Sequence, residues 1–382
     1  MSVGLICEFN PFHYGHKYII DKIHSLTGEQ VICAMSGPFV QRGEPACVSK
    51  YSRTKAALMS GADAVIELPV KYATASAKNF AIGGVNVLKN IHGVTALAFG
   101  VETKKTELLF KIAELKKSEE TENLIKDEMA NGISYPNAVA NAIAKISDGQ
   151  LHREILSKPN NILAIEYISA LSGTDIKPLP IERIGNGYND TNLSGKYASA
   201  SAIRQGLEQG KDDIIKYLPA FMLDVCKKTS VNYKLFDSLT LYALRKLSVE
   251  ELAQLPDMEV GLENAIKKAT YLPSASLVLE EVKSKRYTYA RLKRIFLYAL
   301  LGVNKHIMSD INSIKTRVLG VKQGNKAFLS CLNENIITRN SQLTSEWISD
   351  KSVVLDSFAE DVYSLLTGQK GNSYYREPMI II

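Results

Sequence analysis

The first 210 residues alternate short apolar runs with segments of helical character, and this alternation constrains the fold more than any other feature of the sequence. Short, continuously apolar runs are typical of strands that a parallel sheet buries on both faces. Parallel strands need crossover connections, which the intervening helices supply. We therefore expect a doubly wound α/β domain with its ligand site at the carboxyl ends of the strands. The expected strands are Val3–Cys7, Val31–Met35, Val65–Leu68 and Thr95–Phe99, and the expected helices between and after them are Gly15–Leu26, Ser49–Ser60 and Ser76–Ile91.

The remaining sequence is predicted to be mainly helical. Residues 104–147 contain many Glu and Lys residues and an Ala-rich periodicity but no strand-like run, so we expect a helical insertion between two strands. After about residue 210 the strand signal fades, and leucine-rich helical patterns are interrupted by prolines. The sequence thus predicts an α/β domain over residues 1–210 and a mainly α-helical domain over residues 211–382.

Composition excludes several classes of protein. Of the 382 residues, 46% are hydrophobic and 23% are charged, which is typical of a globular chain. No apolar run approaches the ~18 residues that a membrane-spanning helix needs, so we expect no membrane segment. The N-terminus lacks the features of a signal peptide, and the five cysteines are scattered without a CxxC pair. We therefore expect a cytoplasmic protein without a disulfide framework or a protein-bound metal.

Basic residues are concentrated in one segment, although the formal net charge is only +6. Residues 282–333 contain eleven basic residues and one acid, Asp310, with aromatic residues such as Tyr287 and Tyr289 between them. Basic groups bind phosphates and aromatic faces stack on bases, so the run indicates contact with a nucleic acid. The alternative is a solvated helix face. The basic residues are Lys283, Lys285, Arg286, Arg291, Lys293, Arg294, Lys305, Lys315, Arg317, Lys322 and Lys326.

The strongest local pattern is the segment Cys7–His16, which follows the first expected strand and opens the first expected helix. A helix N-terminus presents unpaired N–H groups and the positive end of the helix dipole, so it binds phosphate. His13 and His16 add side-chain donors where charge develops on a reacting phosphorus, and Gly15 lets a nucleotide approach the backbone. The two histidines are alternatively a metal-binding pair or ordinary buried histidines. Neither a Walker A motif nor a GxGxxG motif is present in the sequence.

A second phosphate-binding pattern is expected near the end of the α/β domain. Ser199 and Ser201 open a helix, and Arg204 follows within one turn. Serines at such a position are more often plain helix caps. Two hydroxyls and a guanidinium at a helix start are also able to hold the phosphates that leave as pyrophosphate. Two such clamps on one sheet favour nucleotidyl transfer.

These motifs carry a resemblance to a known family. His13–His16 resembles the HxGH signature of the nucleotidyltransferase superfamily, and Ser199–Arg204 resembles its C-terminal motif, which is rich in Ser or Thr and ends in Arg or Lys. More narrowly, the sequence resembles the bacterial tRNA(Met) cytidine acetate ligase family over essentially the whole chain. The matching stretches are residues 8–16, 35–46, 61–69, 158–167 and 199–204, with a further basic match at 285–294.

The resemblance implies a reaction in two steps. ATP and free acetate form acetyl-adenylate and pyrophosphate, and the acetyl group then passes to N4 of the wobble cytidine of elongator tRNA(Met). His13 and His16 would stabilise charge on the α-phosphate, and Arg204 with its two serines would hold the departing pyrophosphate. Mg²⁺ is expected with ATP, although no carboxylate cluster in the sequence identifies its ligands.

The resemblance also assigns residues to each ligand. One of Asn160 and Asn161 is expected at the nucleotide, and the sequence does not decide between them. Gln41 and Arg42 are expected to face acetate or the target base, and a structural role for their loop stays open. The other residues expected at ATP are Cys7, Glu8, Phe9, Asn10, Pro11, Phe12, His13, Tyr14, Gly15, His16, Lys17, Tyr18, Ile19, Ile20, Gly100, Arg183, Ser199 and Ser201. The residues expected at tRNA are Lys283, Lys285, Arg286, Arg291, Lys293 and Arg294.

Two other functions stay open on the sequence alone. A small-molecule adenylyltransferase of cofactor biosynthesis has both phosphate clamps but rarely needs a basic helical half. A non-catalytic RNA-binding factor that senses a nucleotide needs a pocket, yet binding alone does not require both clamps.

Overall fold

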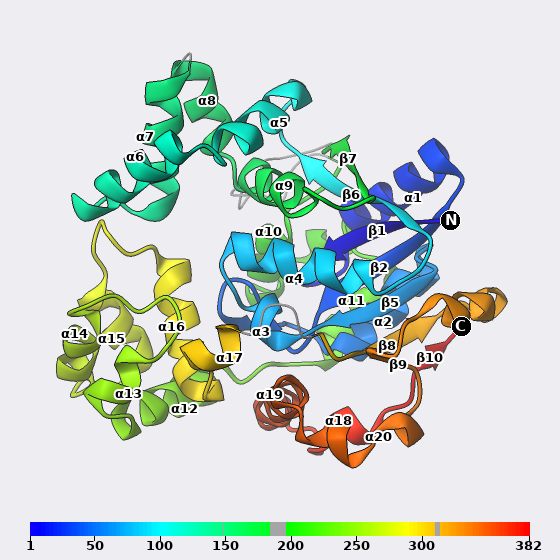
Figure 1. Cartoon of the computed structure of the whole chain (residues 1–382). Coiled ribbons are helices and arrows are strands. Elements are labelled where there is room, and N and C mark those ends of the chain that lie inside the picture. The colour runs from blue at the N-terminus through cyan, green and yellow to red at the C-terminus, as the bar shows by residue number, and fades with distance from the viewer. Residues whose placement is uncertain (148, 184–195, 310–313) are drawn as a thin grey trace.

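A mainly parallel sheet forms the centre of the computed structural model, which describes residues 1–147, 149–183, 196–309 and 314–382. The strand order is β10-β8-β5-β2-β1-β6-β7, and β9 pairs with β8 (Figure 1). Strands β5, β2, β1, β6 and β7 are all parallel to one another, whereas β8 pairs with β5 in the antiparallel direction. The strands of the sheet are β1 (Ser2–Cys7), β2 (Gln30–Ser36), β5 (Ala64–Leu68), β6 (Val94–Val101), β7 (Lys177–Glu182), β8 (Thr316–Val321), β9 (Ile336–Ile337) and β10 (Ile380–Ile381).

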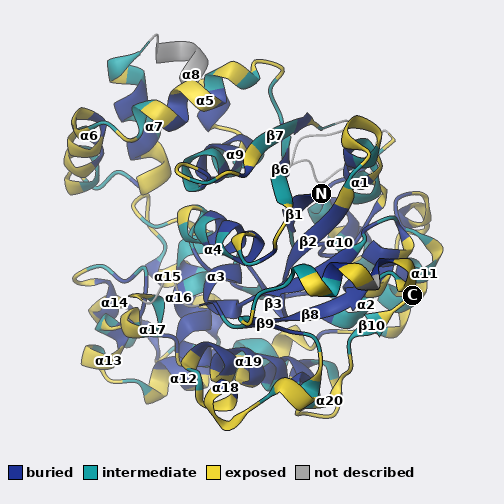
Figure 2. Ribbon diagram, turned by 45° about the vertical axis from the view of Figure 1, so that its right-hand side comes forward, coloured by how far each residue is buried: buried dark blue, intermediate teal, exposed yellow. Residues whose placement is uncertain are grey.

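Helices cover both faces of the sheet, because successive residues of each strand point to opposite faces. On β2, Ile32 and Ala34 belong to one hydrophobic core, whereas Val31 and Cys33 belong to the other. Figure 2 shows the strands buried between the two layers. The predicted doubly wound α/β fold is confirmed. One face carries α3 (Val70–Ala73), α4 (Ala77–Lys89) and α9 (Pro159–Ala170), and the other carries α1 (Tyr14–Thr27), α2 (Lys50–Met59), α10 (Ala200–Glu208) and α11 (Ala220–Lys228).

Four helices lie between β6 and α9 and extend away from the sheet (Figure 1). Leu109, Ile112 and Ala138 of this group share a core with α9, so the apolar faces of the inserted helices continue the core of the α4 side. The four helices are α5 (Thr106–Leu115), α6 (Glu119–Ala130), α7 (Tyr135–Ile146) and α8 (Gly149–Leu156).

A separate core lies among the helices of the C-terminal half. Phe39 and Val70 from the N-terminal half also belong to this core, so the two halves are packed together. Among the described residues, no helix is long and apolar enough to cross a bilayer. The helices that form this core are α12 (Tyr233–Lys246), α13 (Val249–Ala253), α14 (Leu262–Ala269), α15 (Ala275–Val282), α16 (Tyr289–Leu301) and α19 (Lys351–Thr367), and shorter helices are α17 (Lys305–Ser309), α18 (Ser345–Ser349) and α20 (Ser373–Arg376).

The chain returns to the sheet after residue 314, where the sequence predicts no strand. Strand β8 adds to the edge of β5, with Ala64 opposite Val321 and Val65 opposite Gly320. An unpaired edge would leave the backbone groups of β5 exposed, and β8 satisfies them. The sheet therefore takes strands from both sides of residue 210.

A buried ion-pair network connects the sheet to the C-terminal half. Lys50 Nζ lies 2.8 Å from Glu67 of β5 and 3.0 Å from Glu360 of α19. Lys50 is fully buried and the two glutamates are almost fully buried. Burial alone lowers the pKa of Lys50, but Glu360 and Glu67 outweigh it and raise that pKa well above its usual value. Lys50 is therefore charged in the folded protein.

Candidate nucleotide site

The start of α1 places two histidines face to face. His13 precedes the helix, and its Nδ1 accepts a hydrogen bond from the Gly15 N–H at 3.0 Å. His16 Nδ1 accepts a hydrogen bond from the His13 N–H at 3.3 Å. The two rings stack with centroids 3.7 Å apart. Because both Nδ1 atoms are acceptors, the proton of each neutral ring lies on Nε2.

Both imidazoles are neutral at pH 7. Burial, with help from Arg183 and Arg204, lowers the pKa of His13 to about 3. Burial also lowers the pKa of His16 well below its usual value, and His13 and Arg183 add to this effect. The histidines therefore act as neutral N–H donors. His16 lines the central cavity, whereas His13 is only 3% exposed and caps the helix behind it.

Arg204 reaches from α10 to the β1 side of the same site. Its Nη1 donates to the Asn10 carbonyl at 2.6 Å, and its Nη2 donates to Ser201 Oγ at 3.4 Å. Ser199 is the N-cap of α10, and its Oγ accepts from the Ala202 N–H at 3.0 Å. Ser201 and Arg204 line the cavity with His16, so the two predicted clamps face one space, while Ser199 supports the start of α10.

The structure distinguishes Asn160 from Asn161. Asn160 lines the cavity, and its Oδ1 accepts a hydrogen bond from Arg183 Nη1 at 3.4 Å. Asn161 is buried, and its Oδ1 accepts from the Glu102 N–H at 2.8 Å. Gly100 lies beneath Arg183, since a Cβ at position 100 would come within 3.0 Å of Arg183 Cγ. Asn160, Arg183 and Gly100 thus lie together in the cavity wall, and Gly100 is close to Ile19 of α1.

The stretch Cys7–Ile20 is divided between the cavity and the core. Phe12 and Ile20 are buried in the core, and Lys17 is ion-paired with Asp21 on the surface at 2.7 Å. Pro11, Tyr14, Gly15 and Tyr18 also do not line the cavity. The members that do line it are Cys7, Glu8, Phe9, Asn10, His16 and Ile19.

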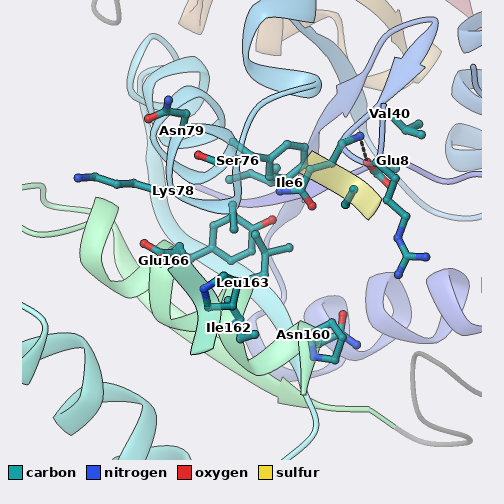
Figure 3. Close-up of a pocket in the computed structure, with 18 of the residues that line it drawn as sticks. Ile6, Glu8, Val40, Ser76, Lys78, Asn79, Asn160, Ile162, Leu163 and Glu166 are labelled. Carbon is teal, nitrogen blue, oxygen red and sulfur yellow. Dashed lines mark hydrogen bonds between the residues drawn. The ribbon is translucent and has the colours of Figure 1, made fainter. Parts of the chain in front are cut away.

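One cavity of about 720 Å³ joins these parts. It extends from the carboxyl ends of β1 and β6 to the inserted helix α7 and to the start of α16. This volume is in the range of small-molecule sites. Figure 3 shows the side of the cavity formed by Ile6, Glu8, Val40, Ser76, Asn79, Asn160, Ile162, Leu163 and Glu166.

A loop after β2 lines the cavity next to the end of β1. It contains the two-stranded ribbon of β3 (Phe39–Val40) and β4 (Glu44–Pro45). Gln41 and Arg42 both line the cavity, and the Gln41 N–H donates to Glu8 Oε1 at 2.7 Å. Gly43 has φ +75°, and a Cβ there would lie 2.6 Å from the backbone of Lys293 and Arg294. The loop is therefore pressed against α16.

Arg53 is a structural residue of the site that sequence reasoning missed. Its guanidinium is fully buried and donates to the carbonyls of Val48, Glu8 and Ser36 at 3.1, 2.6 and 2.9 Å. It thereby connects the backbone at the end of β1 with the backbone at the end of β2. In the sequence it is one of three basic residues of α2, with Lys50 and Lys55, so nothing in the pattern singles it out.

Much of the basic run is neutralised by acids from other segments. Arg286 and Arg291 pair with Glu259 at 2.7 and 2.6 Å, and Arg294 pairs with Asp257 at 2.7 Å. Lys293 pairs with Glu44. Arg286, Arg291 and Arg294 line the cavity, whereas Lys283, Lys285 and Lys293 do not, and Lys285 is exposed. Asp310 lies outside the described residues.

Comparisons with known proteins agree with this geometry. A family model described as HIGH Nucleotidyl Transferase matches residues 1–377. A tRNA(Met) cytidine acetate ligase of Thermoanaerobacter sp. (strain X514) is 38% identical over 381 residues, covering 95% of this chain and 94% of that protein. One of Clostridium perfringens (strain ATCC 13124) is 35% identical and covers 97% of both chains. The chain belongs to the tRNA(Met) cytidine acetate ligase family.

Solved structures extend the likeness to three dimensions. The apo crystal structure of Thermotoga maritima TmcAL matches with a TM-score of 0.92 at 28% identity, covering 100% of this chain and 99% of that one. The structure of the same enzyme bound with alpha-thio ATP matches with a TM-score of 0.90. The predicted membership in the ligase family is therefore confirmed.

Proposed function

We propose that this protein is an ATP-dependent ligase that activates free acetate as acetyl-adenylate and transfers the acetyl group to N4 of the wobble cytidine of elongator tRNA(Met). The observation that carries the proposal is the meeting of His16, Ser201 and Arg204 in one cavity. Relatives named for this reaction over the whole chain, and the alpha-thio ATP in the Thermotoga maritima enzyme, support it. Because the proposed substrate is a tRNA, we also propose that the reaction takes place in the cytoplasm.

The first step transfers the adenylyl group to acetate. An acetate oxygen attacks the α-phosphorus of ATP, the bond to the β-phosphate breaks, and pyrophosphate leaves with the electron pair. His16 Nε2–H donates to the α-phosphate oxygens, where negative charge grows. Arg204 and Ser201 hold the leaving phosphates, and Asn160 with Arg183 orients the adenosine part. His13 positions His16 through the stacked ring and the backbone bond.

Mg²⁺ is proposed only as an ion carried by the triphosphate. Among the described residues, no group of three or more His, Cys, Asp or Glu side chains is placed to hold a metal. The described residues thus offer no cluster of three such ligands, and the triphosphate oxygens are proposed to hold the ion.

The tRNA is proposed to approach from the side of α16. Arg286 and Arg291 line the outer part of the cavity and are bound to Glu259, so they are partly neutralised. Lys285 and Lys283 extend the same basic surface in front of α16. The sugar-phosphate backbone of the tRNA would bind to this basic surface, and the anticodon base would enter the cavity.

The test is incubation of the protein with ATP, Mg²⁺, labelled acetate and an unmodified elongator tRNA(Met) transcript, followed by nucleoside analysis. Label in N4-acetylcytidine that depends on ATP is the expected result. Pyrophosphate release without labelled nucleoside would contradict the tRNA reaction and favour a small-molecule adenylyltransferase. A transcript with uridine at the wobble position is the matched control, because it lacks the amine that receives acetate.

A further inference from the structure

The cavity is lined by four acidic residues, of which three are paired with cations. Glu44 pairs with Lys293, Glu166 with Lys116, and Asp257 with Arg294. Ion-paired carboxylates in such positions are held in place and contribute little as proton acceptors. The fourth acid, Glu8, has no ion pair within 4 Å among the described residues.

Glu8 keeps one carboxylate oxygen unused. Its Oε1 accepts from the Gln41 N–H at 2.7 Å, and no hydrogen bond to its Oε2 is found among the described residues. The side chain is half-buried where β1 ends, next to the segment that leads to His16. The bond to Gln41 orients the carboxylate, so Oε2 is available to a ligand in the cavity.

The charged groups around Glu8 come from three elements. Arg204 of α10, Arg42 of the β3–β4 loop and Arg53 of α2 all act on its carboxylate. Burial nevertheless raises the pKa of Glu8 above its usual value, and these cations with the Gln41 N–H only reduce the shift. A carboxylate with a raised pKa accepts a proton better than an exposed one does.

Gln41 provides a second unsatisfied group beside Glu8. Its backbone holds Glu8, and its side-chain Nε2 is buried without a hydrogen-bond partner among the described residues. A buried amide donor without an acceptor is unfavourable. Because this atom is out of reach of the cavity, Gln41 contributes to the site through its backbone N–H, which orients Glu8.

Cytosine offers a donor to the unused oxygen of Glu8. Its N4 amine carries the N–H groups that a carboxylate can accept. Carboxylates are the usual acceptors for the N4 amine of cytosine. Uracil has a carbonyl oxygen at the same position and would face the carboxylate with a second acceptor.

We propose that Glu8, oriented by the Gln41 N–H, is the acceptor-base subsite, in which its Oε2 binds the cytosine N4 amine and takes its proton during acetyl transfer. The inference rests on the proposed function. N4 attacks the carbonyl carbon of acetyl-adenylate, the C–N bond forms, and the bond from that carbon to the phosphate oxygen breaks. The electron pair leaves on AMP, and the N4 proton passes to Glu8 Oε2. The N4 lone pair is delocalised into the ring, so removal of the proton assists the attack.

The test separates the two half-reactions in Glu8→Gln. Adenylation is measured as acetate-dependent exchange of labelled pyrophosphate into ATP without tRNA, and transfer is measured in a single turnover from preformed acetyl-adenylate to tRNA(Met). We expect transfer to slow by at least ~100-fold, and exchange to persist with a far smaller loss. Retained exchange also shows that the variant is folded.

Three further measurements sharpen the assignment. Glu8→Asp keeps the carboxylate and should recover part of the transfer rate. Glu114→Gln makes the same chemical change at an exposed pair with Lys117 and should leave both half-reactions unchanged. In the parent protein the single-turnover transfer rate should fall as the pH is lowered through the raised pKa of Glu8, and this acidic limb should disappear in Glu8→Gln.

Several outcomes would overturn the inference. Transfer at the parent rate in Glu8→Gln would show that Glu8 takes no proton. Loss of exchange together with transfer would assign Glu8 to ATP or acetate instead. Absence of N4-acetylcytidine with the parent protein would refute the proposed function itself, and this outcome is distinct from both of the others.

Discussion

Replacement of Lys50 by Met tests the role of the buried charge network. The change removes the cation that lies 2.8 Å from Glu67 and 3.0 Å from Glu360, in a place without access to water. Two carboxylates would then share a buried site close to Asp356, whose pKa is already raised by burial and by Glu67. Breaking a buried pair by removing one partner costs about 3–5 kcal/mol. That is a large part of the ~5–15 kcal/mol that holds a typical domain folded.

Urea unfolding followed by circular dichroism measures the free energy of unfolding of the variant. Burial and Glu67 raise the pKa of Asp356 and Lys50 lowers it, so removal of Lys50 raises that pKa further. The loss should therefore be smaller at about pH 5.5 than at about pH 8, because a raised carboxyl pKa gives stability that is present below that pKa and is lost as the pH rises through it. The double variant Lys50→Met with Glu67→Gln is the matched control and should recover part of the loss. A loss below about 1 kcal/mol that is independent of pH would refute the reasoning.

Three further predictions concern the cavity, the loop packed beside it and the basic surface next to it. Gly43→Ala places a Cβ 2.6 Å from the backbone of α16 at φ +75°, so we expect it to cost at least ~1–2 kcal/mol in thermal unfolding and to weaken acetyl transfer; an unchanged melting temperature would contradict this packing. His16→Ala should abolish acetate-dependent pyrophosphate exchange while tRNA affinity in a filter-binding assay stays within about 3-fold, and between pH 6 and 8 the exchange rate of the parent should show no limb from imidazole protonation, because the pKa values of both histidines are lowered far below that range. Charge reversal at Lys285 and Arg286 should weaken tRNA binding and reduce its salt dependence without altering exchange, and equal affinity would dismiss the proposed tRNA surface.

The sequence predicts β1, β2, β5 and β6 because each contains a short apolar run between helices, and most residues of these runs are buried. Strand β7 is not predicted, because Pro178 and Pro180 interrupt it and it lies at the edge of the sheet with most of its residues partly or fully exposed. Strand β8 is not predicted either, because it begins with Thr316 and Arg317 and pairs with β5, which lies more than two hundred residues earlier in the sequence. Arg317 is buried only because Tyr374, Asn340 and Glu377 accept its hydrogen bonds. Such a pairing has no local signature.

The site was predicted in part for the same reason. Helix starts and loops are local, so His16, Ser201 and Arg204 are recognisable from the residues around them. The separation of Asn160 from Asn161 depends on which side of α9 faces the cavity, and neighbouring residues in a helix differ in direction by about 100°. The neutralisation of Arg291 and Arg294 depends on Glu259 and Asp257, which a count of charges within residues 282–333 does not include.

The late arrival of β8 affects how the protein is made. A ribosome completes β5 long before it synthesises residues 316–321, and at ~5–20 residues per second the interval is on the order of ten to fifty seconds. During that time the open side of β5 presents unpaired backbone groups beside apolar residues such as Val65 and Ile66. Nascent chains on neighbouring ribosomes are thus exposed to one another at this strand, and a slow or interrupted translation of the segment before Thr316 prolongs the exposure. The exposure ends only when β8, which is made late in synthesis, pairs with β5.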